Sequence, residues 1–477
     1  MSSPVSTNIT WQPPQDVEKC GESAENTNEL AEPKNHIIEV PDGGYGWVVL
    51  FGVSLFCVST WASNSAYAIY LAHYIEKGLF PGVTILNFAA IGGVGFGTGL
   101  MFGNLILWLT HHTHVKIVIA IGSVFQLAGF LLAAFSTKLW QIYLTQGVLV
   151  GLGLAFIAVP SNALVSMWFR KKRAMAQALS VLGAGVGGIM FSLSLQAIID
   201  NISLRWALII QGIICTFCTW TGIILVKTRD SHVKPIFKVY DLEVMKTLPF
   251  LVMALYVAVT LLGYVILLYN LADFTISLGY SAKQGANVAT MVSVGIIIGR
   301  PIVGRVGDIF GPVSTGIVVH FLCGLFSLAM WIPARNYATA IAFALIQGGL
   351  MGSIWVLLAP ISARLFGLRK LAILLGTFYS IVGLIGVFSP IVGIKLRATP
   401  ADGKYSPTQY RVPAIYCGVV YIASACLLFF IRCYLLARDQ VIESDPNAHE
   451  DNDELHTKVS VAEIFGKVFS KSPKRKI

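Results

Sequence analysis

The sequence predicts an all-α membrane protein whose twelve transmembrane helices form two pseudo-symmetric six-helix halves, and three observations support this fold class. Apolar residues make up 55% of the 477 residues, charged residues make up 12%, and the mean hydropathy is +0.72. Soluble domains are about half apolar and about a quarter charged. The charged residues are concentrated at the two ends and in short gaps between long apolar runs, and landmarks of these runs repeat from one half to the other.

The apolar runs give the transmembrane helices in order. A helix that crosses the hydrocarbon core of a bilayer needs roughly 20 predominantly apolar residues. Twelve runs meet this requirement, at residues 47–72, 83–108, 115–135, 139–159, 174–198, 204–226, 248–270, 285–303, 313–331, 338–360, 371–394 and 412–435.

The polar segments between and beyond these runs give the domain organisation. Both ends of the chain are too polar to bury a core, which predicts disorder, and the N-terminal one lacks the apolar stretch of a signal peptide. We therefore expect a disordered cytosolic N-terminal tail (1–46), an N-terminal six-helix bundle (47–226), a cytosolic linker (227–246), a C-terminal six-helix bundle (247–436) and a cytosolic C-terminal tail (437–477).

An internal repeat supports the division into halves. Parallel repeats of six spans are typical of transporters whose substrate site lies between the repeats. Glycine alone is a weaker signal, because it is common wherever membrane helices pack closely. Landmarks of the fourth run return in the tenth at similar spacing, with Gln146, Gly151, Pro160 and Phe169 matching Gln347, Gly352, Pro360 and Phe366.

Basic residues predict the orientation, because lysine and arginine are retained on the cytosolic side of a membrane. The net charge of +10 is explained by this rule, since no soluble basic domain is present to bind nucleic acid. The last external gap is an exception, with several basic residues of its own. With the amino terminus inside, the cytosolic gaps hold Arg170, Lys171, Lys172, Arg173, the basic residues of the linker, Arg364, Arg369 and Lys370. Both termini are therefore expected in the cytosol.

Patterns typical of enzymes and metal sites do not occur in the sequence. There is no nucleophile–base constellation, zinc-binding H-E-x-x-H pattern or phosphate-binding Gly-Lys loop. Cys215 and Cys218 lie within an apolar run, where packing is the expected role. The histidines at 111, 112 and 114 lack neighbouring carboxylates and are expected at the membrane interface. We expect no enzymatic activity, no cofactor and no metal.

Two motifs lie at the starts of the first and fifth predicted spans. Glycines before the first span permit a tight turn, and its aromatic residues can anchor at the membrane interface. The first motif is Asp42, Gly43, Gly44, Tyr45, Gly46 and Trp47; the second is Trp168 and Phe169, then the basic cluster Arg170 to Arg173 and a run rich in alanine and glycine. Both motifs are similar to signatures of the monocarboxylate transporter family of the major facilitator superfamily, and the chain resembles its fungal branch. Ala178 stands where the family usually has glycine.

A third motif follows the eighth predicted span and consists of Gly304, Arg305, Gly307 and Asp308. It is similar to a cytosolic loop motif of the superfamily, in which the acidic residue and nearby basic residues latch the inner helix ends in one conformation. The resemblance implies a conformational latch made by Asp308 and Arg305 with the basic cluster. The corresponding loop after the second span lacks the acidic residue.

Arg300 is the clearest candidate for the substrate site, because an ionisable side chain within a membrane is costly and functional by default. Arg300-Pro301 resembles the anion-binding Arg-Pro of the family. A guanidinium can bind a carboxylate through two parallel hydrogen bonds. The alternative is that Arg300 belongs to the adjacent loop motif and extends to the cytosolic surface. Further candidates are Asn64, Ser65, Tyr264, His320, Gln146 and Gln347, each of which can instead serve packing between helices.

Two departures from the family pattern put proton-coupled lactate transport in doubt. Proton-coupled members have aspartate one turn before the arginine, where this chain has Ile296. The family's lysine in the first span is replaced by the uncharged stretch Asn64-Ser65-Ala66. His320 could titrate near neutral pH, although a packed, hydrogen-bonded histidine is the alternative.

We therefore expect a secondary transporter that moves a small organic anion by alternating access, with proton coupling left open. Its expected partners are a small organic molecule and the lipid bilayer. The family suggests the plasma membrane, with a vacuolar or other internal membrane as the alternative. Two further hypotheses are a carrier of a neutral or vitamin-like metabolite and a non-transporting membrane sensor on the same fold.

Overall fold

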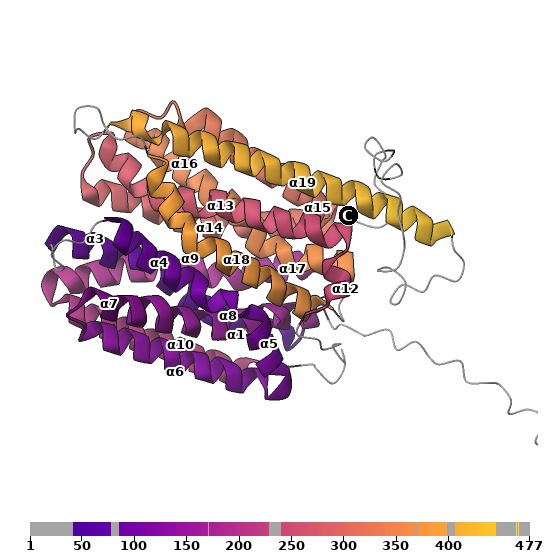
Figure 1. Ribbon diagram of the computed structural model, residues 1–477, viewed down its shortest axis with the longest axis horizontal. Coiled ribbons are helices and arrows are strands. Elements are labelled where there is room, and N and C mark those ends of the chain that lie inside the picture. Colours follow the sequence, from indigo (N-terminus) through magenta and orange to yellow (C-terminus); the bar gives the residue numbers. More distant parts are fainter. Residues whose placement is uncertain are drawn as a thin grey trace, which may run out of the picture. The chain divides into compact units, whose positions relative to one another are not determined.

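Helices account for the regular structure of the chain (Figure 1). The computed structural model describes residues 42–77, 85–169, 171–228, 240–367, 370–397 and 406–444, with Ile464 and Gly466. In these ranges no strand occurs, and eleven helices are long and apolar enough to cross a membrane. A bent pair of helices with an angle of 44° provides a twelfth. The predicted all-α membrane fold is confirmed.

The N-terminal half contains six spans; the first and fourth include a π-turn, and the second is bent at Phe102. Single turns of π-helix are frequent at functional sites. In order, the spans are α1 (Gly46–Cys57) with the π-turn η1 (Val58–Ala62), α2 (Ser63–Ser65) and α3 (Tyr67–Lys77); the bent pair α4 (Ile85–Met101) and α5 (Gly103–His112); α6 (Val115–Ala134); α7 (Leu139–Ile142) with the π-turn η2 (Tyr143–Leu149) and α8 (Val150–Trp168); α9 (Arg173–Asn201); and α10 (Leu204–Leu225).

The C-terminal half begins with the short helix α12 (Leu242–Met245) and continues with six further spans. Its ninth and tenth spans are interrupted, the tenth at Met351 and Gly352. The spans are α13 (Leu248–Ser277); α14 (Ala282–Phe310); α15 (Pro312–Phe326) with the π-turn η3 (Ser327–Trp331); α16 (Tyr337–Leu350) with α17 (Ser353–Phe366); α18 (Leu371–Lys395); and the 3-10 turn η4 (Pro407–Tyr410) with α19 (Arg411–Ser444).

Local sequence sets the ends of the helix that carries Arg300. At the start of α14, the Gln284 amide nitrogen donates to the Ser281 hydroxyl and the Ser281 backbone nitrogen donates to the Gln284 side chain. This reciprocal capping box satisfies two donors that the first helical turn leaves open. At the other end, Gly311 has a φ of 95° and Pro312 begins α15. A left-handed glycine followed by proline makes a sharp turn between consecutive spans.

Two helix pairs join the halves, and the first is α4 against α18 (Figure 1). Here backbone lies against backbone: a Cβ atom added to Gly97 would lie 2.4 Å from the Gly383 carbonyl oxygen, and one added to Gly383 would lie 2.3 Å from the Met101 nitrogen. The Asn104 side chain at the start of α5 donates to the Thr377 hydroxyl of α18 at 3.0 Å. We call this contact, which these five residues define, the glycine seam.

The second pair is α9 against α14. Its glycines face both side chains and backbone: a Cβ added to Gly304 would lie 2.6 Å from the Ala178 Cβ and 2.8 Å from the Ala174 carbonyl oxygen, and one added to Gly188 would lie 2.9 Å from the Ser293 hydroxyl. Asp308 at the end of α14 reaches the first turn of α9. We call this contact the carboxylate seam. Asp308 is also a residue of the predicted latch.

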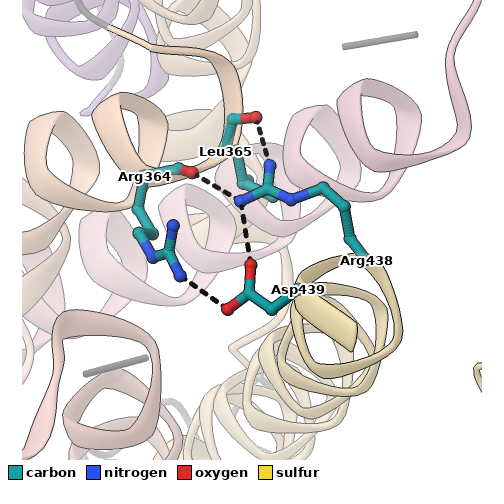
Figure 2. Close-up of polar contacts among 4 residues, drawn as sticks. All are labelled: Arg364, Leu365, Arg438 and Asp439. Atoms are coloured by element: carbon teal, nitrogen blue, oxygen red, sulfur yellow. Dashed lines mark hydrogen bonds and ion pairs between the residues drawn. The ribbon is translucent and has the colours of Figure 1, made fainter. Parts of the chain in front are cut away.

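The last helix continues past residue 436, the predicted limit of the C-terminal bundle, to Ser444. Arg438 and Asp439 in this extension are buried. Figure 2 shows their contacts: the two terminal guanidinium nitrogens of Arg438 donate to the Leu365 and Arg364 carbonyl oxygens at 2.9 and 3.1 Å, and Arg364 pairs with Asp439 at 2.6 Å. This network fixes α19 to the end of α17. Arg170, most of both predicted tails and most of the linker lie outside the described residues.

Candidate functional site

Arg300 lies on α14 with only 2% of its surface exposed. The Tyr264 phenol of α13 and the Cys57 thiol of α1 are electrostatic neighbours of its guanidinium. These neighbours come from the two different halves. Among the described residues Arg300 takes part in none of the ion pairs, and its Nε has no hydrogen-bond partner. Burying an unpaired charge costs several kcal/mol, so Arg300 remains the leading candidate for the centre of the site.

Glycines bring Arg300 close to the tenth span. A Cβ on Gly295 would lie 2.2 Å from the Leu345 carbonyl oxygen, and one on Gly299 would lie 2.3 Å from the Gly349 Cα, so α14 and the tenth span approach along their backbones. One turn further, a Cβ on Gly352 would lie 2.3 Å from Nη2 of Arg300. The guanidinium therefore rests on the point where α16 gives way to α17.

Five aromatic side chains form a connected group that reaches Arg300 through Tyr264, and we call them the aromatic cluster: Trp61, Phe96, Tyr264, Trp355 and Tyr379. Trp355 of α17 is at their centre, with ring centroids 4.8 Å from Trp61, 6.1 Å from Tyr264 and 6.2 Å from Tyr379. Phe96 lies 5.9 Å from Trp61. Tyr264 joins the cluster to Arg300 because it contacts both Trp355 and the guanidinium.

The two tryptophans that meet across the halves lie beside irregular helix turns. Trp61 belongs to the π-turn η1, and Trp355 follows the interruption at Met351 and Gly352 by three residues. The predicted candidates Asn64 and Ser65 come directly after η1; Asn64 is half-buried, and the exposed Ser65 donates its hydroxyl hydrogen to the Trp61 carbonyl oxygen at 2.9 Å. The structure thus places Asn64 and Ser65 on the segment that carries the cluster.

Each of the remaining polar candidates is buried and hydrogen-bonded to residues of its own half. His320 of α15 is fully buried, with Nδ1 2.8 Å from the Gly316 carbonyl oxygen and Nε2 3.2 Å from the Tyr256 hydroxyl. The Gln347 amide donates to the Cys323 carbonyl oxygen, and Gln146 accepts from Tyr74. The structure does not bring these three side chains together with the aromatic cluster.

The predicted latch is organised around Asp308. Its two carboxylate oxygens accept hydrogen bonds from the backbone nitrogens of Ala174 and Met175, at 2.9 and 3.0 Å. A carboxylate at a helix N-terminus is favoured because it satisfies open N–H donors and meets the positive end of the helix dipole. Of the predicted latch residues, Arg305 and Lys172 are exposed, and Gly307 and Gly304 pack near Ala174. These two hydrogen bonds join Asp308 to the backbone of α9.

The two signature motifs form one packed unit. Asp42, which has a φ of 49°, accepts a hydrogen bond from the Lys171 backbone nitrogen at 2.7 Å. The Trp47 and Phe169 ring centroids are 5.1 Å apart, and those of Tyr45 and Trp168 are 5.9 Å apart. Instead of serving the membrane interface alone, as the sequence suggested, the aromatic residues of the first motif bind the second motif.

The signature contact extends to neighbouring residues. The Tyr45 hydroxyl donates to the Leu225 carbonyl oxygen at 2.9 Å, and Arg173 Nε donates to the Phe169 carbonyl oxygen at 3.1 Å. A Cβ on Gly46 would lie 3.2 Å from both Trp168 and Phe169, so glycine permits the close packing. The segment before the first span thereby fixes the loop that leads into α9.

A matching contact occurs in the C-terminal half. Asp241, just before α12, pairs with Lys370 at 2.9 Å, and Lys370 directly precedes α18. An acidic residue before the first span of each half therefore contacts the loop before its fifth span. The N-terminal contact uses a backbone nitrogen, whereas the C-terminal contact is an ion pair.

A cavity of about 130 Å³ lies elsewhere in the C-terminal half. It is lined by Phe274, Trp331, Ile332, Arg335, Pro407, Thr408, Tyr410 and Arg411. None of these residues belongs to the aromatic cluster, so the cavity is separate from the Arg300 site.

Comparison with known families decides what kind of protein carries this site. The model of the Major Facilitator Superfamily matches residues 49–390 and 250–473. The chain belongs to the major facilitator superfamily. This membership agrees with the two joined six-helix halves and makes the protein a secondary transporter with many membrane spans.

Individual relatives of this facilitator agree. The chain is 42% identical over 432 residues to "Probable transporter MCH2" of Saccharomyces cerevisiae, covering 90% of both chains. It is 31% identical to "Uncharacterized transporter ESBP6" of the same yeast, over 83% of this chain and 60% of that one. It is 23% identical to "Monocarboxylate transporter 12" of Homo sapiens, over 88% and 87% of the two chains. The resemblance inferred from the motifs is confirmed.

Sequence analysis did not single out Trp61, Phe96, Trp355 or Tyr379. Aromatic side chains are also frequent on the lipid-facing surface of this facilitator, where Phe217 is 71% exposed. The internal repeat could have pointed to Trp355, because Trp355 lies one turn after Gly352, which is a landmark of the repeat in the tenth span.

Proposed function

We propose that this facilitator transports a small organic anion by alternating access and that Arg300 binds the anionic group. The observation that carries the proposal is a buried guanidinium that forms no ion pair among the described residues. A planar guanidinium suits a carboxylate because it can donate two parallel hydrogen bonds. The substrate supplies the missing partner.

Binding of the anion gives a reason for coupled movement of the halves. The cost of an unpaired buried charge is highest when the site is closed on both sides. A carboxylate on Arg300 lowers that cost, so the loaded carrier crosses the closed state more readily than the empty one. A ligand shifts a conformational equilibrium only through such a difference in interaction between states.

We propose that this chain does not use a side-chain carboxylate beside Arg300 to take up protons. Ile296 occupies the position one turn before Arg300 and is itself buried. The fully buried His320 is a titratable group of the same half, but it lies among Tyr256 and Gly316. Any dependence of transport on a pH gradient therefore has to come from another group or from protonation of the substrate.

Orientation follows from the basic residues. Four lysines lie at one end of the helix bundle, which we call the basic end: Lys171 and Lys172 just before α9, Lys227 just after α10, and Lys370 just before α18. The retention of basic residues in the cytosol favours a cytosolic basic end. We propose the plasma membrane as the location, with both termini inside.

The test is uptake of labelled carboxylates and neutral solutes into proteoliposomes, with and without a pH gradient. Arg300→Ala is expected to abolish saturable anion uptake, and Arg300→Lys to retain a small part of it, because an ammonium keeps the charge but loses the fork. The control is Arg205→Ala, which removes an exposed arginine of α10. Saturable uptake of a neutral solute that Arg300→Ala leaves unchanged would overturn the proposal.

A further inference from the structure

Aromatic side chains near Arg300 are a second feature of the site besides its charge. Arg300 defines one end of the site, where its guanidinium meets the Tyr264 phenol. Beyond Tyr264 lie the other rings of the aromatic cluster: Trp355 and Tyr379 are nearly parallel, with an interplanar angle of 12°, whereas Tyr264 meets Trp355 edge-on at 80°. Parallel-offset and edge-to-face arrangements are the ones that aromatic rings prefer.

Both halves contribute rings to the aromatic cluster. Trp61 and Phe96 belong to the first and second spans, whereas Tyr264, Trp355 and Tyr379 belong to the C-terminal half. The contact of 4.8 Å between Trp61 and Trp355 therefore crosses from one half to the other. When the halves separate on either side of the membrane, this ring contact has to open, and a flat ring of a substrate can replace it.

The helix turns beneath the two tryptophans permit such a movement. Trp61 lies in the π-turn η1, and Trp355 lies one turn after the interruption at Gly352. A π-turn or an interrupted helix has fewer regular hydrogen bonds to break than a continuous α-helix, and such turns are common at functional sites. The ring contact is thus placed at the points where the two spans can adjust most easily.

We infer that the substrate is an aryl carboxylate, a carboxylate attached to a flat aromatic body, whose charged group binds Arg300 and Tyr264 and whose ring enters between Trp61 and Trp355. This inference rests on the proposed function and names the substrate class for the same site. A short aliphatic acid such as lactate satisfies the guanidinium but leaves the ring faces without a partner.

The same site disfavours aromatic amino acids. An ammonium group beside the carboxylate needs an acidic or carbonyl partner, and burying it without one is costly. The aromatic cluster contains no acidic side chain, and Ile296 stands beside Arg300. The repulsion between an ammonium and the nearby guanidinium adds to the cost.

The experiment compares four labelled compounds in proteoliposomes at neutral pH, with protein-free vesicles to subtract diffusion of the neutral acids. Benzoate is the aryl carboxylate, cyclohexanecarboxylate has the same charge on a saturated ring, lactate has no ring, and phenylalanine adds the ammonium. We expect uptake efficiency to be highest for benzoate and lowest for lactate and phenylalanine. Equal efficiency for benzoate and lactate would overturn the inference.

Substitution of the central ring gives the second arm. Trp355→Leu is expected to lower the benzoate-to-lactate ratio by about three- to tenfold, which corresponds to the loss of one aromatic contact, whereas Trp355→Phe keeps most of the ratio. Trp220→Leu is the matched control, because Trp220 is 47% exposed on α10. A ratio that Trp355→Leu leaves unchanged would contradict the inference even if benzoate is transported.

The two possible failures are distinguishable. If no carboxylate shows saturable, Arg300-dependent uptake, the proposed function fails and the substrate class fails with it. If lactate uptake depends on Arg300 but benzoate has no advantage, the anion carrier stands and the aryl class is wrong.

Discussion

The two seams that join the halves are built from equivalent helices but use different forces. In the glycine seam, the backbones of α4 and α18 touch, and the neutral side chains of Asn104 and Thr377 hydrogen-bond to each other. In the carboxylate seam, Gly188 faces a side chain and Gly304 faces both a side chain and backbone, and Asp308 accepts two hydrogen bonds from the start of α9. Pseudo-symmetry thus preserves which helices pack together, whereas the interactions between them differ.

The two seams should therefore be sensitive to different kinds of substitution. Backbone contact depends on short-range packing, so the glycine seam should reject any added side chain and ignore salt. A carboxylate at a helix N-terminus depends on charge, so the carboxylate seam should respond to neutralisation, and it should tolerate an added methyl group where only a side chain lies nearby, as at Gly188. Three substitutions test this difference.

The largest effect is expected from Gly383→Ala in the glycine seam. The new Cβ would lie 2.3 Å from the Met101 nitrogen, and a backbone atom cannot move aside as a side chain can. Overpacking of this kind costs about 1–3 kcal/mol, which should lower uptake by about 10- to 100-fold. The matched control is Gly188→Ala in the carboxylate seam, whose nearest atom is the movable Ser293 hydroxyl. Equal losses in both variants would contradict the distinction between the seams.

A smaller effect is expected from Asp308→Asn. The amide accepts with one oxygen only and carries no charge, which removes about 1–2 kcal/mol of stabilisation at the start of α9. The basic end should then open more often, measured as faster labelling of a cysteine introduced at Ala174. Asp200→Asn is the control, because Asp200 lies at the opposite end of α9 and is exposed. If the labelling rate stays as in the unmodified protein, Asp308 is not a latch.

The smallest effect is expected from Thr377→Val. The substitution keeps the volume and removes the hydroxyl that accepts from Asn104, so the expected cost is about 1 kcal/mol. Uptake should fall by about fivefold. This loss of uptake should be the same at low and high salt, since the hydrogen bond is between neutral groups. The increase in labelling rate caused by Asp308→Asn should instead become smaller as salt rises, because salt screens charge. A Thr377→Val defect that salt alleviates would show that charge also acts in the glycine seam.

The fold and the charged residues of the site could be predicted from the sequence. Long apolar runs can satisfy their backbone only as helices in a bilayer, and a lone arginine within such a run is rare enough to stand out. Arg300 was found in this way, whereas Asp308 was found through the similarity of its motif to a loop motif of the superfamily; the structure places both at contacts between the halves.

The rest of the site depends on which helices meet, and a single sequence does not contain that information. Trp355 and Phe217 are both aromatic residues in apolar runs, yet one lies at the centre of the cluster and the other faces outward. The need for glycine at Gly97 and Gly383 becomes clear only when α4 and α18 are known to lie side by side. The contact of Asp42 with Lys171 likewise joins motifs that are 129 positions apart in the chain.

The buried network of Arg438 and Asp439 also bears on the order in which the protein is made. Arg364 and the carbonyl oxygens at the end of α17 emerge from the ribosome well before their partners, which lie near the end of the last span. Until then the end of α17 lacks the contacts that α19 provides. The tenth span therefore gains these contacts only after α19 has been synthesised, which makes the docking of α19 a late assembly step.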